Sequence, residues 1–425
     1  MRRGATTLLA LVAGCGFDAA VLSTAPAPSL PAEGGVDAGL SSDAGDASGP
    51  SDADDGSDAS DATFEGGGRG SASGVFAGQA FTCALVSGRA WCFGANADGA
   101  LGTGDVQTHL SPTAVATASG FDVMAGGENH ACGLERGTGA VLCWGYSASG
   151  QLGLGDTVTR TAPTRVPLGQ PALAVAAGYN HTCAIGADHS LWCWGDNTEG
   201  QLGQSDATGA ANAPSPVRVG TRADWLRVAA GQGHTCAIEA PGTMWCWGRN
   251  TRSETGTDPA TVQLRSPVQT GAFADWRDLD VGQDASCGIR GDGSLWCWGD
   301  NSFGQLGSAP SAQAVTAPAQ VGADTDYAQI SIDTFSACAR KTGGSIACWG
   351  RNAEGQLGVG DTVDRYAPTQ VGSLTTWTSV SVGRFHSCFS QRDGSVYCAG
   401  DNSSGQLGLG DTARRKVPAL VTFPP

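Results

Sequence analysis

Apolar and polar residues alternate in short runs along the chain from about residue 73 onward. Cys183-Ala184-Ile185 and Leu191-Trp192-Cys193, for example, lie on either side of a turn that contains Gly186. Short runs with β-branched and aromatic residues, separated by glycine, are typical of strands joined by tight turns. The pattern predicts antiparallel hairpins, and the 65 glycines among 425 residues support this because glycine adopts turn conformations without steric cost.

The hairpins recur at an interval that the cysteines mark. Of the 15 cysteines, 14 form seven pairs whose partners are 9, 10 or 11 positions apart. The first cysteines of successive pairs are 49, 51, 53, 51, 51 and 50 positions apart. The pairs are Cys83 and Cys92, Cys132 and Cys143, Cys183 and Cys193, Cys236 and Cys246, Cys287 and Cys297, Cys338 and Cys348, and Cys388 and Cys398. A unit of about 50 residues with several short strands is the length of one propeller blade. The expected fold class is therefore all-β, a seven-bladed β-propeller over residues 73–425.

The same hairpins predict seven disulfides. If Ile185 lies opposite Leu191, Cys183 lies opposite Cys193, and in the first unit the same register leaves Ser87-Gly88 as a two-residue turn. Opposed residues at a non-hydrogen-bonded site have Cα atoms about 4.5 Å apart, which is within the reach of a disulfide. Sequence alone leaves connectivity open, but the repeat favours a bridge within each unit.

The ends of the repeat region suggest how the ring closes. The first unit starts at Gly74 without a preceding Pro-x-x-Val strand, and the last ends with an additional one at Pro418 to Val421. We expect the C-terminal strand to complete the blade begun by the N-terminal strands, since this covers edges that would otherwise recruit other chains.

The recurring elements are HTCAI at residues 181–185, LWCWG at residues 191–195, N-x-x-G-Q-L-G, a following G-D, and Pro-x-x-Val, as at Pro368 to Val371. Together they resemble the regulator of chromosome condensation repeat family. The resemblance implies a seven-bladed propeller. The eukaryotic prototype promotes nucleotide exchange on a small GTPase and binds nucleosomes, and a secreted bacterial relative inhibits a β-lactamase. Only the repeat framework matches, so no individual functional residue is carried over.

The N-terminus has the features of a processing signal. Arg2 and Arg3 precede the apolar run from Leu8 to Ala13, which is too short to span a membrane. The box Val12-Ala13-Gly14-Cys15 resembles a bacterial lipoprotein cleavage site. We expect residues 1–15 to be a signal peptide ending at an acylated Cys15, which also accounts for the odd cysteine. The protein would then be exported and lipid-anchored in the cell envelope, with the outer membrane as the expected location; an ordinary signal cut elsewhere is the alternative.

Residues 16–72 are acidic and rich in small residues. Between Gly16 and Gly68 there are 11 Asp or Glu and no Lys or Arg. Such a segment buries too little apolar surface to offset the cost of ordering its backbone, so we expect a disordered tether. Calcium binding is the alternative, although the full acidic loop pattern is absent. The net charge of −16 argues against nucleic acid as a partner.

Residues that could carry chemistry occupy repeat positions. The histidines two residues before a pair, the tryptophans after a pair and the aspartates of the G-D element all recur in register. We expect the histidines and tryptophans to pack and the aspartates to form turns. These residues are His130, His181, His234, His386, Trp144, Trp194, Trp247, Trp298, Trp349, Asp105, Asp156, Asp361 and Asp411. We find no catalytic motif, cofactor motif or metal motif.

Departures from the repeat are the candidate binding loops. The fourth unit replaces the G-Q-L-G turn with Arg249 to Gly256, and Arg249, Arg252 and Glu254 are our candidate binding residues. The third unit carries the longer segment from Gln204 to Pro216, and the fifth has Ser308-Ala309-Pro310 in place of G-D. Loop insertions in repeat proteins often map to a binding face, with neutral drift as the equal alternative.

The sequence therefore predicts a monomeric, surface-anchored, non-enzymatic propeller that binds an unknown protein or another envelope macromolecule and needs no cofactor. Two alternatives stay open at this point. One is an inhibitor of a secreted enzyme such as a β-lactamase, and the other is a guanine-nucleotide exchange factor.

Overall fold

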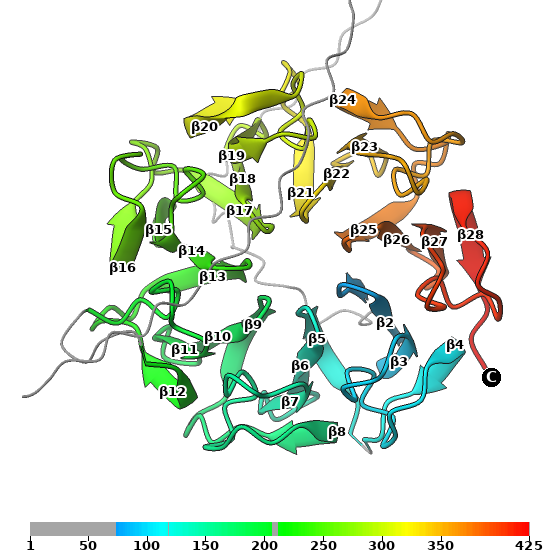
Figure 1. Ribbon diagram of the computed structural model, residues 1–425, viewed down its shortest axis with the longest axis horizontal. Helices are drawn as coiled ribbons and strands as arrows, with labels where there is room; N and C mark the ends of the chain where they lie inside the picture. Colours follow the sequence, from blue (N-terminus) through cyan, green and yellow to red (C-terminus); the bar gives the residue numbers. More distant parts are fainter. Residues whose placement is uncertain (1–73, 118, 206–210, 425) are drawn as a thin grey trace, which may run out of the picture. The chain divides into compact units, whose positions relative to one another are not determined.

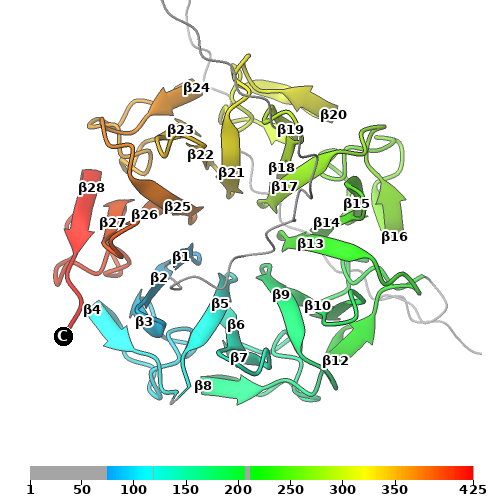
Figure 2. The same cartoon turned by 180° about the vertical axis from the view of Figure 1, so that it is seen from behind.

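The computed structural model describes residues 74–117, 119–205 and 211–424. Seven four-stranded antiparallel sheets surround a central axis like the blades of a propeller (Figures 1 and 2). The predicted all-β seven-bladed propeller is confirmed. Within these residues there is no helix long and apolar enough to cross a membrane. Residues 1–15 with Cys15, and the acidic segment 16–72, lie outside the described residues.

Each blade is one contiguous segment whose strands follow one another from the axis to the rim (Figure 1). Blade 1 contains β1 (Gly74–Ala77), β2 (Phe81–Val86), β3 (Arg89–Gly94) and β4 (His109–Ala114). Blade 2 contains β5 (Phe121–Gly126), β6 (His130–Glu135), β7 (Val141–Gly145) and β8 (Arg160–Arg165). Blade 3 contains β9 (Ala172–Ala177), β10 (His181–Gly186), β11 (Leu191–Gly195) and β12 (Ala213–Arg218). Blade 4 contains β13 (Trp225–Ala230), β14 (His234–Glu239), β15 (Thr243–Arg249) and β16 (Gln263–Gln269). Blade 5 contains β17 (Trp276–Val281), β18 (Ala285–Arg290), β19 (Leu295–Asn301) and β20 (Ser311–Gln320). Blade 6 contains β21 (Tyr327–Ile332), β22 (Ser336–Lys341), β23 (Ile346–Gly350) and β24 (Arg365–Gln370). Blade 7 contains β25 (Trp377–Val382), β26 (His386–Gln391), β27 (Val396–Gly400) and β28 (Arg415–Val421).

The central hairpin of each blade has the register that the sequence predicts. In blade 3, Ile185 lies opposite Leu191 and Cys183 opposite Cys193. In blade 1 the hairpin turns through two residues, Ser87 and Gly88, with φ of 51° and 77°. Two positive φ values in a two-residue loop match the right-handed twist of the flanking strands.

A disulfide joins the paired strands of every blade. The seven bonds link the two cysteines of the same repeat unit, and the Cα atoms of each pair are 4.0 to 4.1 Å apart. This is slightly closer than the spacing of about 4.5 Å expected for a non-hydrogen-bonded pair.

The expected mode of ring closure is wrong. Strands β1 to β4 form one sheet and β25 to β28 another, so among the described residues no blade combines strands from the first and the last repeat unit. The Pro-x-x-Val element is the rim strand that ends a unit, and blade 1 has its own at Pro112 to Val115. The element at Pro418 therefore completes blade 7 and is not additional.

Blades 7 and 1 are joined by packing and hydrogen bonds instead. Side chains from both blades share one buried cluster, which includes Val75, Phe93 and Val396. The Ala77 amide donates to Ser381 Oγ at 2.9 Å. Figure 1 shows blade 1 beside blade 7.

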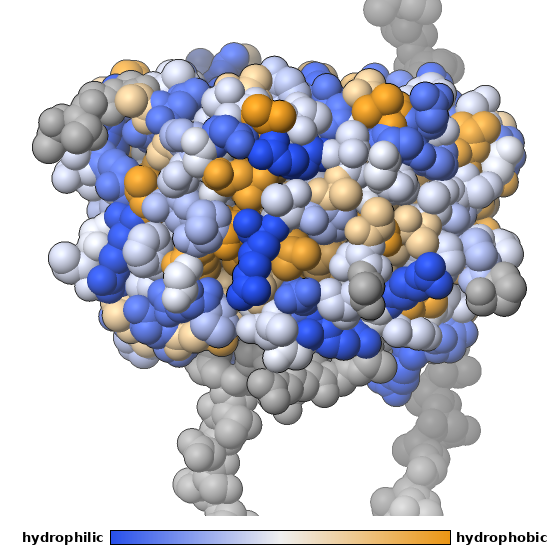
Figure 3. Space-filling model, turned by 90° about the horizontal axis from the view of Figure 1, so that it is seen from below, coloured by the Kyte–Doolittle hydropathy of each residue, from blue (hydrophilic) through white to orange (hydrophobic). Residues whose placement is uncertain are grey.

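The rim strands expose their outer edges, and each of them contains proline. Pro112 lies in β4 and Pro163 in β8, and the corresponding strand of every other blade also carries one. Proline cannot donate a ladder hydrogen bond, so it discourages pairing with a further strand. On the side of the ring in Figure 3, hydrophobic residues form small patches among hydrophilic ones.

Candidate functional site

Seven loops meet around the axis at one end of the ring, where each inner strand turns back into the second strand of its blade. We call this end the channel mouth. The second residue of each loop is glutamine in blades 1, 4 and 5 and a different residue type in each of the other four blades. These residues are Gln79, Glu128, Tyr179, Gln232, Gln283, Thr334 and Arg384. A constant backbone frame therefore presents seven side chains of five residue types, which differ in size and charge, around one opening.

The channel beneath the mouth is a cavity of about 260 Å³ lined by the inner strands of all seven blades. Tyr179 of blade 3 reaches across it to blade 6, where its hydroxyl lies 2.9 Å from Thr334 Oγ1 and 3.5 Å from Asp333 Oδ1. The same hydroxyl lies 3.4 Å from Gln283 Oε1 of blade 5. On the other side, Gln79 donates to Glu128 at 3.0 Å. Side chains from non-neighbouring blades thus cross the channel at its mouth.

Burial alters the ionisation of the groups at the mouth. It raises the pKa of Tyr179 well above its usual range, and the negative charge of Asp333 raises it further. Burial also raises the pKa of the Glu128 and Asp333 carboxyls, while the positive charge of Arg384 lowers both. Asp280, on the channel wall, has its pKa raised to about 7 by burial. Tyr179 therefore keeps its phenolic proton, and the Glu128 and Asp333 carboxyls are costly to ionise.

Beside the mouth, three phenyl rings and two guanidinium groups form what we call the aromatic–arginine cluster. The ring centroids of Phe303 and Phe335 are 4.8 Å apart, and those of Phe335 and Phe385 are 5.4 Å apart. Arg351 lies over the Phe335 and Phe385 rings at 5.3 and 5.4 Å, and Arg384 lies over the same two rings at 5.9 and 5.6 Å. The cluster brings together loops of blades 5, 6 and 7, and Phe303 is exposed.

The structure places two of the three candidate loop residues in the interior. Glu254 is fully buried, and its Oε1 accepts a hydrogen bond from Arg249 Nε at 2.8 Å. Arg249 also pairs with Asp284 of blade 5 and donates to Gln232 Oε1 at 3.0 Å. Arg252 has a side chain that is 54% exposed, so of the three it is the one available to a partner.

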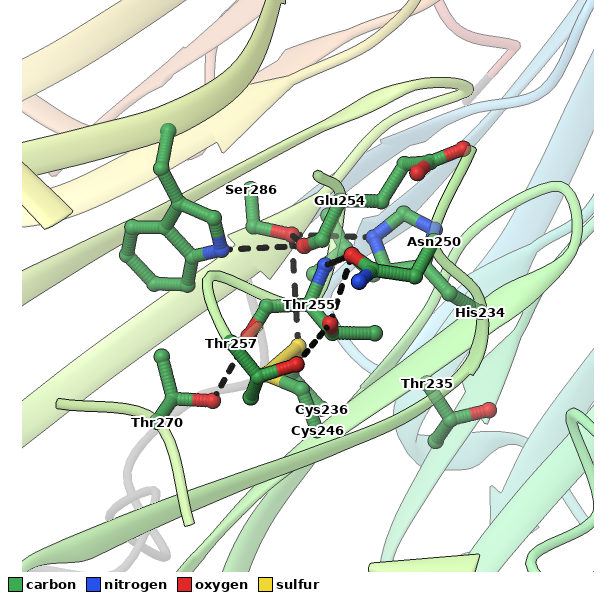
Figure 4. Close-up of a disulfide and its surroundings, with 12 residues drawn as sticks. His234, Thr235, Cys236, Cys246, Asn250, Glu254, Thr255, Thr257, Thr270 and Ser286 are labelled. Atoms are coloured by element: carbon green, nitrogen blue, oxygen red, sulfur yellow. Dashed lines mark hydrogen bonds between the residues drawn. A yellow bond between two sulfur atoms is a disulfide. The ribbon is translucent and has the colours of Figure 1, made fainter. Parts of the chain in front are cut away.

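The fourth-unit turn around these residues is hydrogen-bonded throughout (Figure 4). Asn250 Oδ1 accepts from the amide and the hydroxyl of Thr255 at 3.1 and 2.7 Å. The Glu254 carbonyl accepts from Ser286 Oγ at 2.7 Å and Trp298 Nε1 at 2.9 Å, both of blade 5. The altered turn therefore still fixes the joint to the next blade.

The predicted packing role of the repeated histidines and tryptophans is confirmed. The tryptophans are completely buried, and their Nε1 donates at 2.9 Å to a carbonyl of the preceding blade. Each histidine is also completely buried, and its Nε2 lies 2.8 to 2.9 Å from a Thr or Ser hydroxyl of the following blade. Burial lowers the pKa of His130, His181 and His234 to about 3 and that of His386 to about 4.

The aspartates of the G-D element form turns, as predicted. Asp156, Asp361 and Asp411 each accept from the amide two residues further on at 2.9 Å and pair with an arginine four residues further on. Asp105 has the same arrangement with His109. These carboxylates are therefore used locally.

Sequence reasoning missed the channel-mouth residues and the aromatic–arginine cluster. Each mouth residue stands two positions before the first residue of the second strand of its blade, so the signal that could have found these residues is variation at a fixed position of the repeat. Phe335 and Phe385 lie far apart in sequence, and only the ring brings them together.

Comparisons with known proteins agree with this architecture. Residues 169–425 match the family model of the RCC1-like domain, and residues 87–134 and 138–185 match the regulator of chromosome condensation (RCC1) repeat. The ultraviolet-B receptor UVR8 of Arabidopsis thaliana is 27% identical over 63% of this chain and 62% of its own length. The human E3 ubiquitin-protein ligase HERC2 is 28% identical over 52% of this chain and 5% of its own length. The chain thus spans less than two thirds of either relative.

Solved structures show the same fold. Prp20p of Saccharomyces cerevisiae, described with its binding to Gsp1p and histones, aligns with a TM-score of 0.69 at 19% identity over 81% of this chain and 86% of that chain. Human WBSCR16 aligns with a TM-score of 0.70 at 20% identity over 79% of this chain and 94% of that chain.

Proposed function

Because the chain belongs to the RCC1-like domain family, we propose that it is a non-enzymatic propeller that binds another protein at its channel mouth. The observation that carries this proposal is the set of seven side chains, of five residue types, that one repeated backbone frame presents around a single opening. Loops held by a rigid scaffold are a common place for recognition. Among the relatives, Prp20p binds other proteins and UVR8 is a receptor.

The positions of the nucleophile-like groups support binding rather than catalysis. His181 Nε2 lies 2.9 Å from Thr235 Oγ1, which is the spacing of a base and a nucleophile. Both residues are completely buried between blades, and the Thr235 hydroxyl also donates to the Gln201 carbonyl at 2.8 Å. A substrate has no access to such a pair, so its role is to join two blades.

The same proposal includes export and a lipid anchor. Seven disulfides suit an oxidising compartment, and a chain acylated at Cys15 would carry the propeller on residues 16–72 at the envelope, with the outer membrane as the expected location. Changing Cys15→Ser should move the protein from the membrane fraction to the soluble fraction without exposing a new free thiol. Retention in the membrane fraction, or a disulfide to Cys15, would contradict the anchor.

Capture from envelope extract tests the binding function. The intact exported protein should retain a defined protein partner, while the same protein reduced and unfolded should not. Loss of capture on reduction alone would point to the disulfide-stapled hairpins, and capture of nothing by the folded protein would contradict the proposal.

The two alternatives have their own readouts. We expect no change in nitrocefin hydrolysis by a β-lactamase when the purified protein is added. We also expect no faster loading of fluorescent nucleotide onto a small GTPase. A dose-dependent effect in either assay would replace the binding proposal with the corresponding activity.

A further inference from the structure

We propose that the aromatic–arginine cluster is the docking site for an acidic peptide segment of the protein partner. A carboxylate of the segment would bind the guanidinium groups of Arg351 and Arg384, and a neighbouring apolar side chain would pack against Phe303. This inference rests on the proposed function and adds the place on the mouth and the chemistry of the partner.

The first argument is the rigid placement of the two cations. Both guanidinium groups lie within 6 Å of the same two phenyl centroids. Stacking on an aromatic face fixes a planar guanidinium and leaves its edge free to bind a carboxylate with two parallel hydrogen bonds. The Phe335 and Phe385 rings are themselves stacked, with 23° between their planes, so the platform is shared.

The second argument is that these cations have unused hydrogen-bond donors. Among the residues that the structure describes, none accepts a hydrogen bond from Arg384, and its Nε is buried without a partner. Arg351 has one contact, at 3.5 Å, between its Nη2 and Glu354 Oε1. Buried donors are normally satisfied, so an anionic acceptor would complete this site.

The third argument is the distribution of charge over the mouth side of the ring. The loops that join the third and fourth strands of blades 1 to 3, residues 95–108, 146–159 and 196–212, contain no Lys or Arg. The corresponding loops of blades 4, 6 and 7 contain Arg252, Arg351 and Arg414. The same three loops also carry carboxylates, and each of these arginines lies within 4 Å of a carboxylate, so this half of the mouth differs from the other by offering cations and not by its net charge. The cations are a local feature of this part of the surface, and the whole chain has a net charge of −16.

The fourth argument is the exposed apolar edge next to the cations. Phe303 is 38% exposed and stands edge-on to Phe335, with 84° between the ring planes. An aromatic anchor beside an arginine is the composition of an interface centre rather than of an ordinary polar surface. The partner segment is thus expected to combine acidic and apolar residues.

A labelled-peptide assay on the full-length protein tests the site. The probes are a fluorescein-labelled peptide of alternating Glu and Phe and a matched peptide of alternating Lys and Phe, followed by fluorescence polarisation. The Glu–Phe peptide should bind, and its binding should weaken as salt is added. Arg351→Gln with Arg384→Gln should weaken it by about tenfold or more, because charge-assisted hydrogen bonds are lost. Equal binding of both peptides, or no effect of the double variant, would overturn the proposal.

Matched variants protect the result from unfolding artefacts. Arg277→Gln changes an exposed arginine at the second residue of strand β17, at the end of the strand away from the mouth, and should leave binding unchanged. Phe303→Ser alters a partly exposed side chain and should weaken binding of the Glu–Phe peptide. This variant provides the test if the double arginine variant fails to fold. Wild-type affinity in a folded Phe303→Ser protein, with the double variant unfolded, counts against the proposal.

A photo-crosslinker identifies the occupant. Benzoyl-phenylalanine in place of Phe303 should crosslink the Glu–Phe peptide. Crosslinks instead to a second copy of the chain, or to residues 16–72 of the same chain, would assign the surface to those occupants and overturn the proposal. If a partner is captured equally by wild type and by the double arginine variant, the proposed function stands and this inference fails; if wild type captures nothing, the proposed function fails.

Discussion

At the scale of single residues, the fourth unit shows a coupled exchange of charge. In blades 3, 5 and 7 the turn glutamine donates to an aspartate, as Gln201 does to Asp196 at 2.9 Å and Gln305 to Asp300 at 3.0 Å. In blade 4 the two positions are Glu254 and Arg249, with the donor and acceptor reversed at 2.8 Å. The contact is kept in blade 4 although both residue types change, whereas blades 1, 2 and 6 have Ala95, Tyr146 and Arg351 at the aspartate position and form the same turn without it.

Changing Glu254→Gln should destabilise the protein. The substitution leaves the Arg249 guanidinium with one charged partner fewer inside the molecule, at an expected cost of about 1–3 kcal/mol in the free energy of unfolding. Urea denaturation measures this cost. Glu199→Gln is the control, because Glu199 occupies a partly exposed position of the neighbouring turn; equal effects of the two changes would contradict the assignment.

The buried histidines predict a loss of stability in mild acid. The pKa of His181 is about 3 in the folded protein, against about 6.5 in an unfolded chain. Between these two pH values the unfolded chain binds more protons than the folded protein does. The contribution of His181 to the stability of the folded protein is therefore complete above pH 6.5 and falls as the pH decreases. Asp280 acts in the opposite direction, because its pKa is raised to about 7.

A single-histidine variant separates these effects. Between about pH 6 and pH 4.5, wild type should lose about 2 kcal/mol more of its unfolding free energy than His181→Gln does. Urea midpoints at both pH values provide the measurement. Parallel pH profiles for the two proteins would show that His181 is protonated in the folded state.

At the scale of elements, the disulfide-stapled hairpin is the unit that recurs. Cys236 lies opposite Cys246 in the centre of β14 and β15, and its neighbours Ala237 and Trp245 are paired as well. The bond closes a short loop, so its main effect is on the unfolded chain.

Replacing both Cys236 and Cys246 by Ala should cost about 2–3 kcal/mol by the chain-entropy argument, and less if the hairpin is already rigid without the bond. Thermal unfolding under non-reducing conditions gives the cost, and peptide mapping without reduction checks the other six pairs. Crosslinks between different units, or free thiols in exported material, would contradict the pairing.

Elements were predictable where neighbours in sequence are also neighbours in space. The register of Cys183 with Cys193 follows from one turn, so the sequence predicts it correctly. The prediction of which strand begins a blade is wrong, because the pattern of a Pro-x-x-Val strand such as that at Pro418 fits either the first or the last strand of a unit. The contact between Phe335 and Phe385 depends on the curvature of the whole ring, which no local pattern contains.

At the scale of the whole molecule, we call the contact between two neighbouring blades a seam, and the polypeptide does not cross the seam between blades 7 and 1. Between blades 2 and 3 the chain itself runs from β8 to β9, but between blades 7 and 1 there are only non-covalent contacts. The two seams nevertheless use the same hydrogen bonds. Thr82 Oγ1 lies 2.8 Å from His386 Nε2 and donates to the Gln406 carbonyl at 2.8 Å.

The matching threonine of the covalently continuous seam provides an internal control. Thr182 Oγ1 lies 2.9 Å from His130 Nε2 and donates to the Gln151 carbonyl at 2.8 Å. Thr82→Val and Thr182→Val each leave a buried histidine Nε2 without its hydroxyl partner, so each should lower the free energy of unfolding by about 1–3 kcal/mol. Thr82→Val also leaves the Gln406 carbonyl without this donor, whereas the Gln151 carbonyl still accepts from Trp194 Nε1 at 2.9 Å in Thr182→Val.

The two variants should differ in local opening. Separation of blades 7 and 1 needs no change in chain connectivity, so Thr82→Val should speed amide exchange of β1 and β25 well before global unfolding. Thr182→Val should not do this at β5 or β9, because the chain keeps those blades in register. Hydrogen exchange followed by mass spectrometry measures each strand separately. Equal local exchange in the two variants, at equal loss of global stability, would mean that the seam between the first and last blades is as strong as a seam that the chain crosses.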